Sequence, residues 1–465
     1  MSSSLPATAS MERLRKLAKD LQRAHRAGDT DALSRVAARH PEPSDPLKLT
    51  EAQFVLAREH GFPSWPRLQA YVRRVEECGP ELEHAYHADL AYYAERAAGL
   101  LVSAQDETPE AVAAFEKWRQ PRTRPGARAV VARRHGFENW RELKKHVGSL
   151  AESGEPFARA YQAVEAQDVE GLAALLGRFP ELVKARGTNG NDLLGMATAT
   201  HDERLVRVLL EHGADPSRAN AHGSTPLHQS GYVGLPHLAK LLLDAGARVD
   251  GSARGDGGTP LVMALFWGHR ETADLLAGHG LAPRNLRVAA GLGWRDLLDE
   301  LIGPDGTLAP EAGAHRGFYR PHSGFGAWQP SDDPAEIRNE ALSWAARNGR
   351  LEALDLLVAR GADLEADVYQ GTALAWAAFG GRADAVERLL ALGADVNGRG
   401  SFGGPEHGEG STALHLAAQS GWLDVLGVLL AAGADRTIRD ALYDATPAEW
   451  AEHCGQPEAE RLLRS

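Results

Sequence analysis

A short phrase recurs through the last two-thirds of the chain. A leucine pair is followed by Gly-Ala-Asp and, after a gap, by Thr, then Pro or Ala, then Leu. Copies of the phrase begin at the leucine pairs 209–210, 242–243, 356–357, 389–390 and 429–430. Some copies lack one residue of the phrase. A unit of this size is too small to bury its own apolar face, so the units must stack on one another. The repeat therefore predicts a solenoid, which offers an extended surface to a partner.

The spacing of the repeat identifies its type. Leu194 and Leu227 lie 33 residues apart, and Thr412 and Thr446 lie 34 apart. A period near 33 that carries Thr-Pro-Leu-His, as at 225–228, resembles the ankyrin repeat, which is a β-turn followed by two antiparallel helices. This resemblance implies an all-α fold, an ankyrin-repeat solenoid over residues 156–465.

The residues of one copy fit this structure. Thr225 is placed to cap a helix, and Pro226 suits the first helical turn because no N–H partner is needed there. Gly246 is suited to end the second helix in a left-handed conformation. Eight repeats are expected to start near residues 190, 224, 258, 285, 337, 371, 411 and 445. A helix pair that precedes them, and a short polar last repeat, are expected to cap the stack.

Two insertions depart from the repeat pattern. A loop at 303–334 follows a degenerate repeat at 286–302, which lacks Gly-Ala-Asp. A Gly-rich extension occupies 398–410. Insertions in a solenoid map to loops on one face, which is often the binding face. The 303–334 insertion is therefore a candidate functional segment.

A second motif is duplicated in the N-terminal region. Ala-Arg-x-His-Gly-Phe-x-x-Trp occurs at 57–65 and again, 75 residues later, at 132–140. We expect each copy to be a helix that ends at the Gly, a tight turn, and a second helix that starts at Ser64 or Asn139. Capping-box spacing is present at Asn139 and also, for the preceding helix, at Thr50. Residues 11–150 are predicted to form a helical module of two related units.

This duplicated motif looks like the N-terminal extension of some bacterial ankyrin-repeat proteins. That resemblance implies no activity that could be transferred. His60 and His135 precede the motif glycines, and we interpret them as C-terminal helix residues favoured by the helix dipole, ahead of a role as ligands.

Charge and cysteine content limit the function classes. The 465 residues include 63 acidic and 51 basic side chains, a net charge of −12, which argues against nucleic-acid backbone binding. Cys78 and Cys454 lie at opposite ends of the chain, so no disulfide framework is readable, and a reducing cytosol is indicated. We see no signal peptide and no apolar run long enough to span a bilayer. A cytoplasmic location is predicted.

The leading functional prediction is a protein–protein interaction module that binds its partner on the concave ankyrin face. Exposed aromatic side chains there would be candidate anchors, although a packing role is an equal alternative. Four aromatic residues follow the small-residue ends of first helices, and two more candidates lie in turns: Tyr232, Phe266, Trp267 and Phe379, with His222 and Tyr369.

The alternative prediction is an enzyme or small-ligand binder that uses the 303–334 insertion. His315, Tyr319 and His322 are its candidate catalytic residues, as part of an anion pocket or proton-transfer site. A structural plug or partner contact is the favoured interpretation, because no Cys or acidic residue stands at metal-ligand spacing beside these histidines. No cofactor and no metal are predicted.

The repeat positions also predict structural roles. His228 and His415 follow Thr-Pro-Leu or Thr-Ala-Leu, where a histidine is expected to bond across turns and hold the stack. Trp344, Trp376 and Trp450 occupy matching places in their repeats and are expected to be mostly buried.

Overall fold

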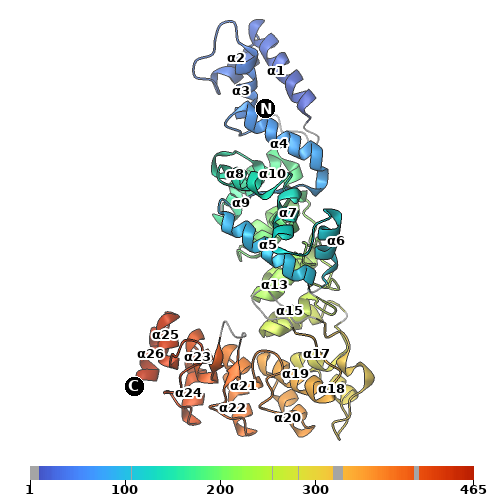
Figure 1. Cartoon of the computed structure of the whole chain (residues 1–465), viewed down its shortest axis with the longest axis vertical. Helices are drawn as coiled ribbons and strands as arrows, with labels where there is room; N and C mark the ends of the chain where they lie inside the picture. The colour runs from blue at the N-terminus through green and yellow to red at the C-terminus, as the bar shows by residue number, and fades with distance from the viewer. Residues whose placement is uncertain (1–9, 106, 254, 281, 318–327, 403–407) are drawn as a thin grey trace. The chain divides into compact units, whose positions relative to one another are not determined.

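The computed structural model describes residues 10–105, 107–253, 255–280, 282–317, 328–402 and 408–465. Contacts divide the chain into two compact units: residues 1–226 with 244–247 form unit 1, and residues 227–243 with 248–465 form unit 2. Each unit is built from short helices (Figure 1). The domain boundary predicted between residues 150 and 156 stays a prediction.

Unit 1 begins with the helices that contain the duplicated motif. These are α1 (Met11–Arg26), α2 (Thr30–Ala37), α3 (Leu49–Glu59) and α4 (Trp65–Cys78), then η1 (Gly79–Glu81), α5 (Leu90–Gln105), α6 (Pro109–Lys117), α7 (Arg124–Arg134), α8 (Trp140–Val147) and η2 (Leu150–Glu152). The duplicated motif forms the α3–α4 and α7–α8 corners. Gly61 and Gly136 have positive φ at these corners, and Ser64 and Asn139 are the N-caps of the following helices, as predicted.

Two details of the motif differ from the predictions. Thr50 lies inside α3, whose N-cap is Lys48, and Glu51 closes this helix by accepting from the Lys48 N–H at 2.7 Å. His135 is at the C-cap of α7, but burial lowers its pKa to about 3. It is therefore neutral near pH 7, and the helix dipole is not what favours it.

The rest of unit 1 contains the capping helix pair and the first repeat. Its elements are α9 (Pro156–Glu165), α10 (Val169–Arg178), η3 (Pro180–Lys184), β2 (Arg186–Gly187), η4 (Thr188–Gly190), α11 (Leu193–Thr198) and α12 (Glu203–Glu211). Helix α9 packs on α11, and α10 packs on α12. The short strand β1 (Glu83–His84) pairs in parallel with β2, so the N-terminal helices are joined to the turn of the first repeat.

A polar cluster, which we call the junction, is buried beside this strand pair. Glu83 forms an ion pair with Arg134 at 2.5 Å and accepts from the Asn189 N–H at 3.0 Å. His135 Nε2 lies 3.0 Å from the Thr188 hydroxyl. A second buried pair, Arg74 with Glu155 at 2.5 Å, lies beside His146. The N-terminal helices are therefore fixed to the first repeat by groups that are costly to bury alone.

Unit 2 continues the repeats. Its elements are α13 (Pro226–Val233), which starts at the boundary, α14 (Pro236–Asp244), α15 (Pro260–Trp267), α16 (Arg270–Ala277), α17 (Leu286–Leu292), α18 (Arg295–Leu301), η5 (Pro310–Gly313), α19 (Pro334–Arg347), α20 (Leu351–Ala359), α21 (Ala373–Phe379), α22 (Ala383–Ala391), β3 (Gly400–Ser401), β4 (Glu409–Ser411), α23 (Ala413–Ser420), α24 (Leu423–Ala431), α25 (Pro447–His453) and α26 (Pro457–Arg464). The helices α11 to α26 make eight pairs within the described residues, as the repeat spacing predicts.

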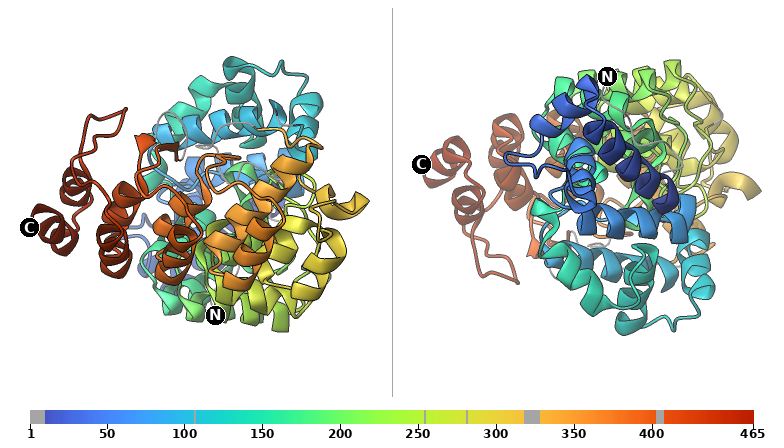
Figure 2. Two further views of the ribbon diagram at one scale, coloured as in Figure 1. Left: turned by 90° about the horizontal axis from the view of Figure 1, so that it is seen from below. Right: turned by 90° about the horizontal axis from the view of Figure 1, so that it is seen from above.

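The helix pairs of unit 2 form two layers. The first helices from α17 to α25 contact one another in chain order, and the second helices from α18 to α26 do the same (Figure 1). The orange and red pairs also follow one another in this order in Figure 2. One apolar core runs between the layers from Leu286 to Leu463. Trp344, Trp376 and Trp450 are all buried, as predicted.

Side-chain donors connect several neighbouring repeats of unit 2. His228 Nε2 lies 3.0 Å from the Gly258 carbonyl oxygen, and His415 Nε2 lies 3.1 Å from that of Ala445, which confirms the predicted bonds across turns. Other donors follow a left-handed glycine and reach a carbonyl at the end of an earlier first helix: His269 to Tyr232 at 3.0 Å, Arg350 to Gly291 at 3.0 Å, Arg382 to Arg347 at 3.1 Å, and Trp422 to Phe379 at 2.9 Å. These bonds satisfy helix C-terminal carbonyls that would otherwise lack partners.

Candidate functional site

The predicted aromatic anchors of unit 2 form one connected group of rings. Tyr232 contacts Trp267 with 5.4 Å between ring centroids, and Phe266 contacts Trp376 at 5.5 Å. Adjacent ring pairs Phe266–Trp267 and Trp376–Phe379 are 5.3 and 6.1 Å apart. The group therefore extends over the first helices α13, α15 and α21.

These rings differ in how much surface they offer. Tyr232, Trp267 and Phe379 are half-buried, whereas Phe266 is fully buried and Tyr369 is 5% exposed. The burial of Phe266 favours the packing role that was its alternative, and Tyr369 is also buried. Only the three half-buried rings could touch a partner without rearrangement.

Arg347 lies at the centre of the group. Its guanidinium carbon is 3.5 Å from the Trp376 ring centroid and 4.6 Å from that of Phe266. Nη1 donates to the Phe266 carbonyl oxygen at 3.1 Å, and Nε donates to the Ser343 hydroxyl at 3.2 Å. Among the described residues no carboxylate forms an ion pair with it. Burial lowers the Arg347 pKa to about 9, so the side chain stays charged near pH 7 and is stabilised by ring faces.

The start of the 303–334 insertion is held by buried ion pairs. Glu340 of α19 accepts from Arg287 Nη1 at 2.9 Å and from Arg316 Nε at 2.5 Å. Arg316 also pairs with Glu336 at 2.9 Å. This arrangement fits the structural interpretation of the segment as far as residue 317.

The alternative catalytic residues are only partly described. His315 is exposed, and its Nδ1 lies 2.9 Å from Asp256 Oδ2. Tyr319 and His322 lie outside the described residues. The enzyme or small-ligand alternative therefore stays a prediction. No group of His, Cys, Asp or Glu within the described ranges could hold a metal ion.

His222 belongs to unit 1, whereas the aromatic group belongs to unit 2. Its Nδ1 is 2.8 Å from the Ser103 hydroxyl of α5, and its Nε2 is 3.4 Å from Asn189 Nδ2. Both ring nitrogens thus contact residues of the same unit. The described contacts give His222 a place where the N-terminal helices meet the first repeats.

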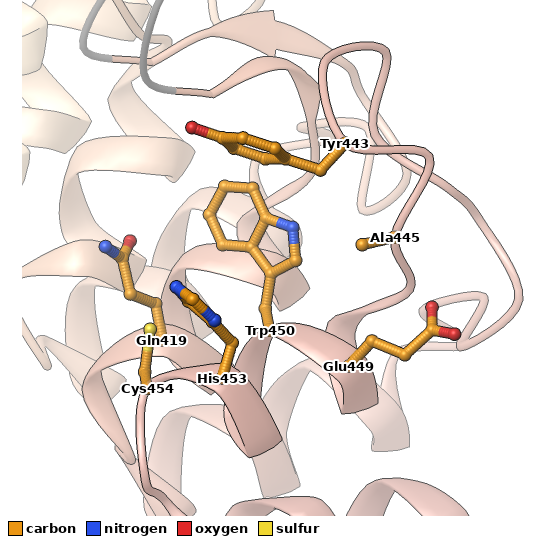
Figure 3. Close-up of a pocket in the computed structure, with 7 residues that line it drawn as sticks. All are labelled: Gln419, Tyr443, Ala445, Glu449, Trp450, His453 and Cys454. Carbon is orange, nitrogen blue, oxygen red and sulfur yellow. The ribbon is translucent and has the colours of Figure 1, made fainter.

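A pocket that the sequence did not predict lies at the C-terminal end of the stack. It has a volume of about 440 Å³ and is open to solvent between α23, α25 and the turn before α25 (Figure 3). Its lining residues are Gln419, Tyr443, Ala445, Glu449, Trp450, His453 and Cys454. The available signal was Tyr443, a large aromatic residue in a turn; it is 61% exposed.

Comparison with known families identifies the repeats. A family model described as ankyrin repeats (3 copies) matches residues 195–286 and 323–399, and a single ankyrin-repeat model matches 409–441. Together with the two helical layers, these matches show that the chain is an all-α repeat protein that contains ankyrin repeats. Ankyrin repeats indicate a protein–protein interaction module.

Several known proteins are similar to parts of the chain. Protein PhlB of Serratia liquefaciens is 34% identical over 142 residues, which cover 29% of this chain. The probable E3 ubiquitin-protein ligase XBOS32 of Oryza sativa subsp. japonica is 27% identical over 219 residues, 46% of this chain. The protein fem-1 homolog A-like of Mus musculus is 31% identical over 102 residues, 22% of this chain.

The matched regions span 62%, 40% and 15% of the lengths of these three relatives. The predicted bacterial origin of the N-terminal extension stays a prediction. Within the part of the chain that the structure describes, no helix is both long and apolar enough to cross a membrane.

Proposed function

We propose that the protein is a cytoplasmic interaction module that binds a protein partner on the concave face of its ankyrin repeats. One observation carries the proposal: three half-buried rings, Tyr232, Trp267 and Phe379, come from three different first helices of one connected group. Aromatic side chains in ordered surroundings are typical anchors of protein interfaces.

The surroundings of these rings support the proposal. Phe266 and Trp376, which contact these rings, are buried, and the Arg347 guanidinium carbon lies 4.6 and 3.5 Å from their ring centroids. A surface that is ordered before binding loses little conformational entropy when a partner docks. The cytoplasmic location is supported by Cys78 and Cys454, which are both free thiols.

The test is a combined substitution in the full-length chain, Tyr232→Ala with Trp267→Ala and Phe379→Ala. Partners captured from the native host by the unchanged protein are expected to bind the variant at least about tenfold more weakly, because anchor residues each contribute roughly 1–2 kcal/mol or more. Far-ultraviolet circular dichroism checks that the helices remain.

The matched control removes exposed apolar side chains outside the aromatic group, Trp294→Ala with Leu423→Ala. Both lie at the start of second helices and are about two-fifths exposed, at 40% and 38%. The control is expected to retain the partner. Partner binding that survives the triple substitution, with the fold intact, would contradict the proposed surface.

A further inference from the structure

The pocket at the C-terminal end of unit 2 has two aromatic walls. The Tyr443 and Trp450 rings are 6.4 Å apart at an interplanar angle of 69°, so they form a corner, with Tyr443 above Trp450 in Figure 3. Tyr443 is 61% exposed and Trp450 is 8% exposed. The corner is therefore accessible on the Tyr443 side and supported on the other.

One buried carboxylate, that of Asp440, accepts hydrogen bonds from both aromatic residues of the pocket. Asp440 is 3% exposed, and its Oδ1 accepts from the Tyr443 N–H at 2.8 Å. Its Oδ2 accepts from Trp450 Nε1 at 3.2 Å. The backbone of Tyr443 and the indole of Trp450 are thus positioned before any ligand binds, which lowers the entropic cost of binding.

One carboxylate, that of Glu449, is among the residues that line the pocket. Its Oε2 accepts from the Thr446 N–H at 2.6 Å and from the Thr446 hydroxyl at 2.9 Å. These hydrogen bonds lower the Glu449 pKa, so the carboxylate is ionised near pH 7. Arg439 Nη1 lies 3.4 Å from the same oxygen. Over residues 408–465 the sequence nevertheless has nine acidic and four basic side chains.

We propose that this pocket receives a lysine or arginine side chain of the protein partner. The aromatic walls would contact the alkyl stem and attract the cation, and Glu449 with the acidic excess of residues 408–465 would complement it. An acidic side chain would be repelled by the same charges. A purely apolar side chain would gain contact with the rings and nothing from the carboxylates. The inference rests on the proposed function, since it names the chemistry of that partner.

The test uses blocked tripeptides and the full-length chain, so it does not depend on knowing the partner. Acetyl-Gly-Lys-Gly-amide and its Arg analogue are titrated against the ¹⁵N-tryptophan-labelled protein, which has ten indole N–H signals. The Trp450 signal is assigned with the Trp450→Phe variant. The norleucine and glutamate tripeptides are the ligand controls, because norleucine keeps the stem of lysine without its charge.

Two variants on one turn isolate the aromatic wall. Tyr443→Ala removes it, whereas Leu442→Ala removes a neighbouring side chain that is 39% exposed and does not line the pocket. Lysine and arginine peptides are expected to shift the Trp450 signal saturably, and to bind the Tyr443→Ala protein roughly threefold to tenfold more weakly. Leu442→Ala should leave the affinity unchanged, and Tyr443→Phe should largely retain it. Added salt should weaken binding.

Several results would overturn the inference: no shift of Trp450 with the cationic peptides, equal binding of the norleucine or glutamate peptide, or an unchanged affinity in Tyr443→Ala. Failure of the proposed function is a separate result. It would appear as partner binding that survives the triple substitution at Tyr232, Trp267 and Phe379, and it would not alter the peptide titration.

Discussion

The junction of unit 1 and the aromatic group of unit 2 both bury charged side chains, but they stabilise them differently. At the junction, Glu83 pairs with Arg134 and Glu155 pairs with Arg74, among histidines kept neutral by burial. In unit 2, Arg347 is held by ring faces and by neutral oxygen acceptors. The chain therefore accommodates buried charge with two sets of partners, and the two should respond differently to pH.

The largest expected difference is in acid. Burial lowers the pKa of His84 and His146 to about 4 and that of His135 to about 3, from the usual 6.5. Below pH 6.5 the unfolded chain protonates such a histidine, whereas the folded chain keeps it neutral. Its contribution to the unfolding free energy is therefore complete above pH 6.5 and is lost as the pH falls toward the folded-state pKa. Each such histidine lowers the unfolding free energy by about 1.4 kcal/mol per pH unit in that window. Burial raises the pKa of Glu83, so protonation of this carboxyl group favours the folded state and partly offsets the effect of the histidines as the pH falls.

The measurement is amide hydrogen exchange at pH about 7 and about 5, corrected for the intrinsic exchange rate. Protection of α5 and α7 should fall more than that of α19 and α21, because Arg347 keeps its charge throughout this range. If α5 and α7 lost no more protection than α19 and α21, the expected difference in pH response between the two regions would be wrong.

The second expected effect is that of Glu83→Ala. It leaves Arg134 without its buried partner and the Asn189 N–H without its acceptor. Removing one member of a buried ion pair costs about 3–5 kcal/mol. Urea unfolding should show this loss, with Glu81→Ala as the control. Glu81 pairs with Lys117 on the surface, and such pairs contribute about 1 kcal/mol or less. If the two variants were equally stable, the buried Glu83 pair would stabilise the fold no more than the surface pair of Glu81 does.

The smallest expected effect is that of Arg347→Met. Methionine keeps much of the packing against Trp376, and no buried carboxylate loses its partner. The Phe266 carbonyl loses one donor, so we expect a loss of about 1–3 kcal/mol. Arg388→Met, on the exposed side of α22, is the control and should change stability by about 1 kcal/mol or less. If Arg347→Met lost more stability than Glu83→Ala, the aromatic group would depend on its buried charge more than the junction does.

Local signals explain how much of the fold could be predicted. Thr259 caps α15 and Gly268 ends it in a left-handed conformation, and comparable residues mark the other helix pairs. The roles of His228 and His415 followed from repeat position alone. The junction gave no such signal, because Glu83 and Asn189 are 106 residues apart and belong to no common periodic pattern.

The candidate site was less predictable. Repeat position placed Tyr232, Trp267 and Phe379 on first helices, but it could not separate them from Phe266, whose burial depends on Arg347 and Trp376 from later repeats. The C-terminal pocket was missed because it depends on how one turn carries Tyr443 over Trp450. A periodic pattern contains no information on the path of such a turn.

The degenerate repeat has a consequence for how the stack comes apart. At Gly291, helix α17 lies close to Leu265: an added Cβ would be 3.1 Å from the Leu265 side chain. Helix α19 contacts α15 as well as α17. Asn348 Nδ2 donates to the Leu265 carbonyl at 2.9 Å. In most solenoids each repeat touches only its immediate neighbours, so unfolding can spread one repeat at a time. Here contacts beyond the nearest neighbour, including that of Phe266 with Trp376, tie the four repeats from α15 to α21 into one cooperative block. Fraying from either end should pause when it arrives there.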